Sequence, residues 1–204
     1  VMASSVDLFA CGIGAPRPAV DKAKELGKTT AALIGSPRHV RKALASGVDM
    51  IVAQGAEAGA HTGTIGTFTL VPQIVDACAG LPVLAAGGVA TGRHVAASLA
   101  LGAQAVWAGT IWLTTTEHTA HMAPGLVDKL LAASSADTII TRSESGKTMR
   151  QIRSSWSDEW DAADAPAPLK MPYQDVLVGD LLGAIDEHQV MPLLHSPAGQ
   201  GIGY

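Results

Sequence analysis

Short apolar runs alternate with amphipathic stretches along the first half of the chain. The apolar runs cover residues 6–14, 28–35, 48–55, 81–88 and 103–114. They show no in–out alternation, which is typical of parallel strands buried on both faces. Between them, helices are predicted from Pro, Ser and Gly signals at their ends, in residues 16–27, 36–47, 67–80 and 92–102.

The alternation of strands and helices predicts a parallel α/β fold. Two architectures fit it, a (β/α)8 barrel and an open, doubly wound sheet. The five predicted strands are fewer than the eight that a closed barrel needs. We therefore expect the chain to be the C-terminal part of a longer protein, with N-terminal strands absent.

The alternation stops at about residue 114, so the sequence predicts two parts, 1–114 and 115–204. Residues 117–136 are predicted to be helical, and 137–156 to form a short strand and an irregular region. Residues 161–174 are rich in Pro and Ala and are predicted to be extended, with a helix at 175–188.

Composition and charge narrow the function classes. The net charge is −4 and no basic patch occurs, which argues against nucleic acid or an acidic membrane surface as a partner. No uncharged run is long enough for a membrane span. Cys11 and Cys78 are predicted to be two reduced, packed thiols, which favours a cytoplasmic protein.

Two successive strands end in glycine, at Gly87–Gly88 and at Gly109–Thr110. Unpaired backbone N–H groups at a Gly-rich turn and at a helix N-terminus bind phosphate. Barrels often hold a phosphate group between the loops after two neighbouring strands. These loops therefore predict a phosphate site, against the alternative of two ordinary tight turns.

The segment "GAEAGAHTG", residues 55–63, places one imidazole among small residues after an apolar strand. The carboxyl ends of barrel strands carry the chemistry, and His61 is a natural proton acceptor near neutral pH. The small neighbours leave room for a planar ligand. Glu57 is expected to orient the loop or to cap a helix.

No metal site is predicted, because no pair of the other histidines has ligand spacing with a carboxylate. His118 and His121 are three residues apart and are expected to share a solvated helix face.

Three motifs together resemble the nitronate monooxygenase family, also called 2-nitropropane dioxygenase-like proteins. The family patterns are G-x-E-A-G-G-H-x-G, P-V-(I/L)-A-A-G-G-I with a (D/T)-G-R turn, and G-A-D-G-V-x-x-G-T-x-F-L. The chain has "GAEAGAHTG", "PVLAAGGVATGR" and "GAQAVWAGTIWL" in the same order and spacing. The resemblance covers residues 6–113, and "SGKTMR", "PAPLKMPYQ" and "AGQGIG" in the tail are also similar.

The resemblance implies an FMN-dependent (β/α)8 barrel enzyme, with the FMN-binding units in residues 1–114. His61 would be the catalytic base, taking a proton from the carbon next to the nitro group, or would interact with the nitronate. The residues implied to contact FMN are Gly87, Gly88, Gly109 and Thr110 at the phosphate, Gln54 and Gly55 near the flavin or its ribityl chain, and Gln200 and Gly201 near the isoalloxazine edge. Ala60 departs from the family, which has Gly there.

Other functions also fit the sequence. The same loop and glycine pattern occurs in FMN-dependent enoyl-acyl-carrier-protein reductases, so an enoyl thioester reductase or a CoA-linked isomerase also fits. A non-catalytic or truncated phosphate-binding barrel is a third alternative. The expected partner is a small-molecule substrate, a nitronate or an enoyl thioester, and a homo-oligomer is compatible with the sequence.

Overall fold

The computed structural model describes residues 4–78 and 80–204 and divides into two compact units. The first unit contains Val1–Ala56 and Gly63–Trp107, and the second contains Glu57–Thr62 and Ala108–Tyr204. Ala79, near the end of the predicted helical segment 67–80, lies outside the described residues.

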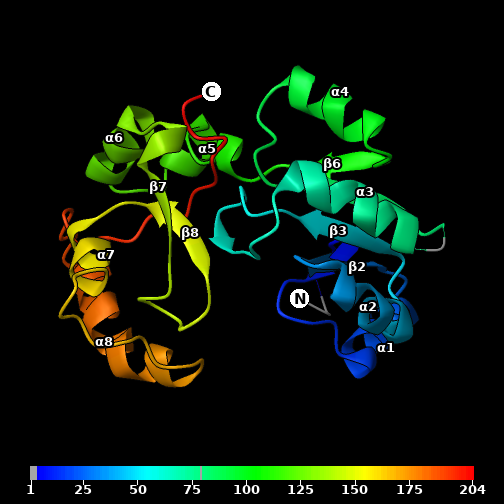
Figure 1. The fold of residues 1–204 in the computed structure, drawn as a ribbon, viewed down its shortest axis with the longest axis horizontal. Helices are drawn as coiled ribbons and strands as arrows, with labels where there is room; N and C mark the ends of the chain where they lie inside the picture. Colours follow the sequence, from blue (N-terminus) through cyan, green and yellow to red (C-terminus); the bar gives the residue numbers. More distant parts are fainter. Residues whose placement is uncertain (1–3, 79) are drawn as a thin grey trace. The chain divides into compact units, whose positions relative to one another are not determined.

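The first unit is built on a sheet of five parallel strands (Figure 1). The strands are β1 (Leu8–Cys11), β2 (Thr29–Ile34), β3 (Met50–Gln54), β5 (Val83–Ala86) and β6 (Ala105–Trp107). Their order in the sheet, β1-β2-β3-β5-β6, follows the order of the chain. In a doubly wound sheet the order of the strands reverses at a switch point. In a barrel wall, neighbouring strands follow one another in chain order. The order is therefore that of a (β/α)8 wall, and the barrel alternative is confirmed.

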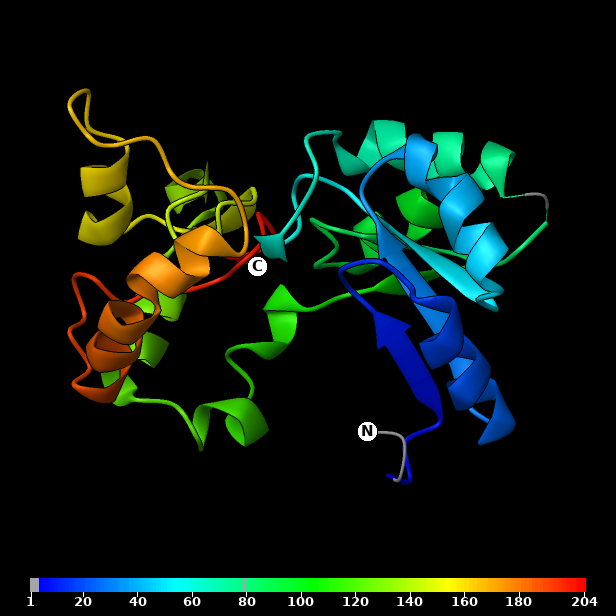
Figure 2. The same ribbon diagram turned by 90° about the horizontal axis from the view of Figure 1, so that it is seen from below.

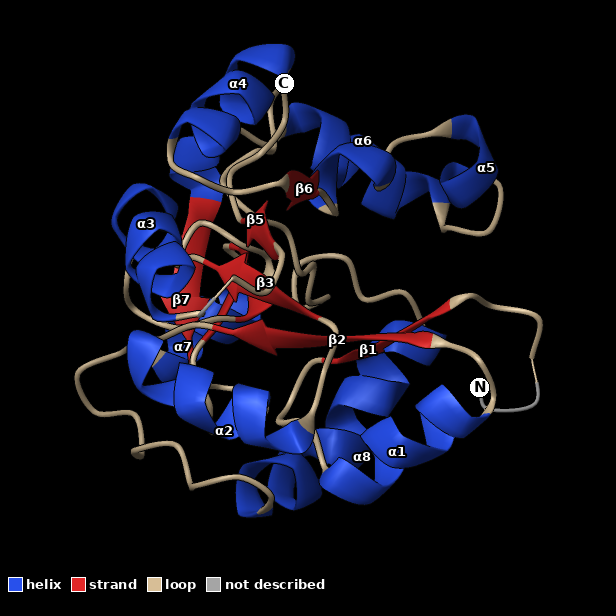
Figure 3. Ribbon diagram, turned by 90° about the vertical axis from the view of Figure 1, so that its right-hand side faces the viewer, coloured by secondary structure: helices blue, strands red, loops and turns tan. Residues whose placement is uncertain are grey.

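The helices of the first unit cover one face of this sheet (Figure 3). They are α1 (Arg17–Glu25), α2 (Val40–Ser46), α3 (Thr67–Ala77) and α4 (Gly92–Ala100), with a 3₁₀ turn, η1 (Pro37–His39), before α2. Ile51 and Ala53 of β3 pack in the same core cluster as Leu70 and Ile74 of α3. Placing all connections on one face is what a barrel requires, because its other face forms the interior.

The opposite face of the sheet is also buried, although its side chains are small. Ala31, Val52 and Ala86, from three neighbouring strands, are at most 3% exposed and pack with Leu84 and Trp107. Burial on both faces explains why the strands read as continuous apolar runs. Cys11 and Cys78 are both buried and free, as predicted.

The last predicted strand of this series is shorter than the sequence suggested. Residues 103–114 form β6 only up to Trp107, and Thr110–Trp112 form a 3₁₀ turn, η2. Gly109 leaves the extended conformation with φ −119° and ψ −58°. Trp112 is 58% exposed, so the apolar residues after Gly109 do not continue the buried strand.

The second unit contains a small antiparallel sheet with the order β4-β8-β7. Its strands are β4 (Ala60–His61), β7 (Thr138–Thr141) and β8 (Met149–Ile152). β8 lies within the segment predicted to be irregular. The sequence pattern did not reveal it because Arg150 and Gln151, two polar residues, are buried in its centre.

The helices of the second unit are α5 (Thr116–Thr119), α6 (Pro124–Ala132), α7 (Ser155–Trp160) and α8 (Tyr173–Glu187), with a 3₁₀ turn, η3 (Ser135–Asp137). The predicted helix at 175–188 is confirmed as α8, the orange helix in Figure 2. Val178 and Ile185 of α8 pack with Trp156 of α7. The predicted helical stretch 117–136 is divided, since proline occupies the first turn of a helix readily but not its interior.

The expectation that His118 and His121 share a helix face is wrong, because α5 ends at Thr119. In the described part of the chain, no helix has both the length and the apolar character needed to cross a membrane.

Candidate active site

The loop after β5 has a backbone that only glycine adopts readily. Gly87 and Gly88 have φ values of 100° and 72°, in the left-handed region that side chains disfavour. Among the described residues, the N–H of Gly88 has no acceptor. The loop leads into α4, where the backbone N–H groups of Ala90 and Thr91 donate to His94 Nδ1 at 3.1 and 3.2 Å. An unpaired donor just before a helix N-terminus is suited to bind an anion.

Gln54 and Gly55 lie beside this loop in the first unit, at the carboxyl end of β3. Gln54 is in register with Ala86, and the Gly55 N–H donates to the Ala86 carbonyl at 2.9 Å. The Thr67 hydroxyl donates to the carbonyl of Gly87 at 2.9 Å. A Cβ atom on Gly55 would overlap Thr67. The structure therefore brings Gln54, Gly55 and Gly87 together.

Gly109 and Thr110 belong to the second unit and also carry unpaired donors. Neither backbone N–H finds an acceptor within the described ranges. A Cβ on Gly109 would meet no atom within 4 Å, so the space beside it is open. The Thr110 hydroxyl accepts a hydrogen bond from the Gly199 N–H at 2.9 Å, which leaves its own proton available.

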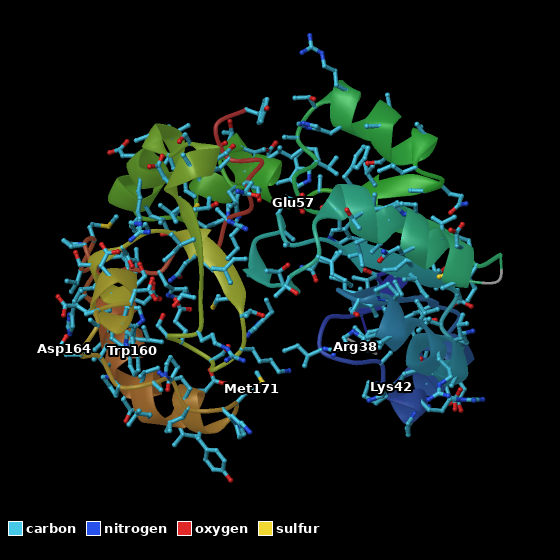
Figure 4. All side chains as sticks on the ribbon, in the orientation of Figure 1. Arg38, Lys42, Glu57, Trp160, Asp164 and Met171 are labelled. Carbon is cyan, nitrogen blue, oxygen red and sulfur yellow. The ribbon has the colours of Figure 1, made fainter. Side chains whose placement is uncertain are left out.

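The "AGQG" loop of the second unit, residues 198–201, packs against the segment that precedes His61. The Gln200 N–H donates to the Glu57 carbonyl at 2.8 Å, and Ser135 Oγ donates to the Gln200 carbonyl at 2.6 Å. A Cβ on Gly59 would lie 2.7 Å from the Gly199 nitrogen. Thr110, Gln200 and the adjoining Gly201 are thus brought together with the turn at Glu57. Glu57 is labelled in Figure 4.

Close contacts within the protein explain why "GAEAGAHTG" has glycine at three positions. Gly55, Gly59 and Gly63 each meet a neighbouring backbone or side chain that a Cβ would overlap, and for Gly63 the neighbour is the Gly35 carbonyl oxygen at 2.6 Å. Room for a planar ligand stays a prediction. Burial lowers the pKa of Arg150, and the negative charge of Glu57 acts in the opposite direction. A role of Glu57 in orienting the loop stays a prediction.

Ala60 adopts a left-handed conformation with φ 59°. This conformation costs a residue with a side chain about 1–2 kcal/mol, and it explains why glycine suits this position. Ala60 nevertheless pairs with Arg150, and His61 with Met149, in the β4–β8 ladder. The strain is therefore located directly beside the candidate catalytic residue.

His61 is half-buried, and its Nε2 lies 2.7 Å from Ser145 Oγ. Its pKa is lowered from the ordinary histidine value, mainly by burial and further by the positive charge of Lys147, while Asp175 acts in the opposite direction. A lowered pKa keeps the imidazole neutral at neutral pH. Because the unfolded chain binds this proton more readily, His61 makes the fold less stable as the pH falls through the ordinary histidine range.

Substitutions of Lys147 and of Asp175 should shift the pKa of His61 in opposite directions. We expect Lys147→Gln to raise the pKa of His61, because it removes a nearby positive charge, and Asp175→Asn to lower it. NMR titration of the His61 ring in the two variants measures both shifts against the wild-type protein. Shifts of the same sign in the two variants would contradict this electrostatic account.

Ser145, Lys147 and Asp175 are the residues around His61 that the sequence did not single out. Ser145 and Lys147 both lie in "SGKTMR", a segment to which the family resemblance assigns no role. Asp175 is on α8 and has no sequence signal that would link it to His61. In the described ranges, no cluster of three His, Cys, Asp or Glu side chains is placed to hold a metal ion.

Comparisons with known protein families and sequences point to one group. The family model described as nitronate monooxygenase matches residues 1–200. The Mycobacterium tuberculosis protein Rv1533, named for a monooxygenase, is 51% identical over 87% of this chain and 47% of its own length. A Staphylococcus aureus (strain Newman) protein named for a nitronate monooxygenase is 38% identical over 82% of this chain and 50% of its own. The chain thus spans about half the length of these curated relatives.

Solved structures agree with the fold. A nitroalkane oxidase from Streptomyces ansochromogenes superposes with a TM-score of 0.84 at 29% identity, covering 98% of this chain and 59% of that chain. FabK from Thermotoga maritima gives a TM-score of 0.80 at 29% identity, covering 97% of this chain and 62% of that chain.

Proposed function

Because the chain belongs to the nitronate monooxygenase family, whose members are oxidoreductases, we propose that it takes part in the FMN-dependent oxidation of alkyl nitronates by O2. The observation that carries this proposal is the environment of His61. A half-buried imidazole is held on Ser145 with a lowered pKa. Such an imidazole can exchange a hydrogen bond or a proton with a nitro group near neutral pH.

The residues of the first unit fit an FMN phosphate. The unpaired Gly88 N–H and the adjoining N-terminus of α4 provide a donor and the positive end of a helix dipole. The left-handed backbone at Gly87 and Gly88 lets a phosphate approach the main chain without a Cβ in the way. Gln54 and Gly55 lie at the same sheet edge, which supports their assignment near the flavin.

In the second unit, the donors of Gly109 and Thr110 also suit an anion, and their assignment to the same phosphate stays a prediction of the family resemblance. Gln200 and Gly201 are proposed to approach the isoalloxazine edge. When bound, FMN would accept electrons from the substrate and pass them to O2. The chain's own residues would bind the flavin, and His61 would contact the nitro group at the reacting carbon.

A substitution in the phosphate loop tests the flavin site. We expect Gly88→Asp to abolish FMN retention, because it places a negative charge next to the phosphate and forces a side chain onto a left-handed backbone. The visible absorbance of the purified protein reports bound flavin.

Gly47→Asp is the matched control for this variant. Gly47, at the C-terminal end of α2, has φ 78°, and a Cβ there meets no atom within 4 Å. The same charge and the same left-handed backbone are then tested away from the phosphate loop, so flavin content should not change. Wild-type flavin content in a folded Gly88→Asp variant would show that the phosphate site has been placed wrongly.

A cytoplasmic location and a homo-oligomeric state remain predictions of the sequence.

A further inference from the structure

The hydrogen bonds of Ser145 determine the direction of its bond to His61. Ser145 is 4% exposed. Its Oγ has two partners, His61 Nε2 at 2.7 Å and the backbone N–H of Lys147 at 3.3 Å. The Lys147 N–H can only donate, so Ser145 Oγ accepts that bond. Within the described residues, His61 Nε2 is then the sole acceptor available to the Ser145 hydroxyl proton.

The alternative direction would leave a buried group unpaired. If Nε2–H donated to Ser145, the hydroxyl proton of Ser145 would have no acceptor, and an unsatisfied buried donor costs about 1–3 kcal/mol. If Ser145 donates to Nε2, every polar atom of the hydroxyl is satisfied. A neutral imidazole that accepts at Nε2 carries its proton on Nδ1.

We propose that Ser145 is a positioning residue that holds neutral His61 with its proton on Nδ1, so that His61 offers a hydrogen-bond donor to an anionic nitronate oxygen instead of a base at Nδ1. The substrate part of this statement rests on the proposed function, whereas the tautomer does not. A nitronate has already lost its carbon-bound proton and needs a donor at its oxygen. A neutral nitroalkane needs a base, which His61 could supply only through Nε2 after Ser145 releases it.

The loop that carries Ser145 is held on both sides, so its hydroxyl is fixed in place. On one side, Thr62 N–H donates to the Thr148 carbonyl at 3.1 Å, and Thr148 Oγ1 donates back to the Thr62 carbonyl at 2.7 Å. On the other side, Gln174 Nε2 of α8 donates to the Ser143 carbonyl at 2.7 Å. The charged groups that act on the ring, Lys147 and Asp175, come from this loop and from α8.

The direct test is ¹⁵N NMR of the histidine side chains, with the His61 signal assigned by its loss in His61→Gln. We expect wild-type His61 to be protonated on Nδ1, and Ser145→Ala to shift the signal toward a mixture containing the Nε2–H form. Ser145→Thr, which keeps the hydroxyl, should retain the wild-type tautomer. Ser143→Ala, in the same loop but bonded to Thr141, should retain it too.

Kinetics supply a second measurement that a merely structural role would not reproduce. Ser145→Ala should lower kcat/KM for an alkyl nitronate by about 10-fold and reduce the preference for nitronate over the neutral nitroalkane. Ser145→Thr should restore both.

An Nε2–H tautomer in the wild-type protein, or an unchanged tautomer in Ser145→Ala, would overturn the proposal. If Ser145→Ala fails to fold, the wild-type and Ser145→Thr spectra still decide the tautomer. If His61 is protonated on Nδ1 but the protein oxidises no nitronate, the tautomer assignment is supported and the proposed function is refuted.

Discussion

Replacing His61 with Ala is expected to lower the rate of nitronate oxidation by about 10²–10³-fold, the usual cost of losing one hydrogen-bond donor that is positioned at an anionic oxygen. The imidazole is held by Ser145 and kept neutral by burial and by Lys147. Alanine removes the proposed contact between the imidazole and the nitronate. Flavin content should be unchanged, since no flavin-binding role is assigned to the ring.

Steady-state oxygen consumption with a preformed alkyl nitronate measures this effect, with flavin absorbance read on the same sample. His188→Ala is the matched control, because His188 is exposed at the end of α8. It should have wild-type activity. Turnover of a flavin-loaded His61→Ala variant at a rate near that of the wild type would show that His61 has no catalytic role.

Gly146→Ala is expected to destabilise the protein by about 2–4 kcal/mol, from overpacking together with a strained backbone. Gly146 has φ 76° and is buried, and a Cβ there would overlap the Leu169 carbonyl oxygen and lie 2.8 Å from the Met171 nitrogen. Both contacts are backbone atoms, which cannot move aside like a flexible side chain. The loop that carries Ser145 should therefore be displaced.

Urea unfolding of this variant gives the change in free energy, and the His61 NMR signal reports on the displaced loop. Gly179→Ala in α8 is the control. A Cβ at Gly179 meets no atom within 4 Å, and alanine in a helix interior is favoured over glycine by about 0.5–1 kcal/mol. Opposite signs are expected for the two variants. Equal stability of Gly146→Ala and the wild type would show that the loop is loosely packed.

Much of the parallel sheet could be predicted because its strands are buried on both faces and its helices end at glycine or begin at proline. β2 and β3 were apparent as continuous apolar runs for this reason. The choice between barrel and doubly wound sheet depended on strand order, which no local pattern contains. β8 was missed because its buried residues are polar, and their burial depends on partners distant in sequence, such as Thr138, which accepts from Arg150.

The candidate site also contains residues that the sequence indicates and residues that it does not. His61 and the glycines could be proposed from the sequence because their residue types carry the signal, whether a titratable ring or a glycine-rich turn. Ser145 could not be found, since a serine 84 positions from its partner is unremarkable until β4 pairs with β8. The sequence marks Ala60 only as a departure from the glycine that the family has at that position, and the structure adds its left-handed backbone.

The claim that the protein is a flavin-dependent nitronate oxidase is tested most directly by anaerobic mixing of the FMN-loaded protein with an alkyl nitronate or with NAD(P)H. We predict rapid bleaching of the oxidised flavin absorbance by the nitronate and slow bleaching by NAD(P)H. Rapid bleaching by NAD(P)H with no response to the nitronate would contradict the account and would favour a reductase of enoyl thioesters.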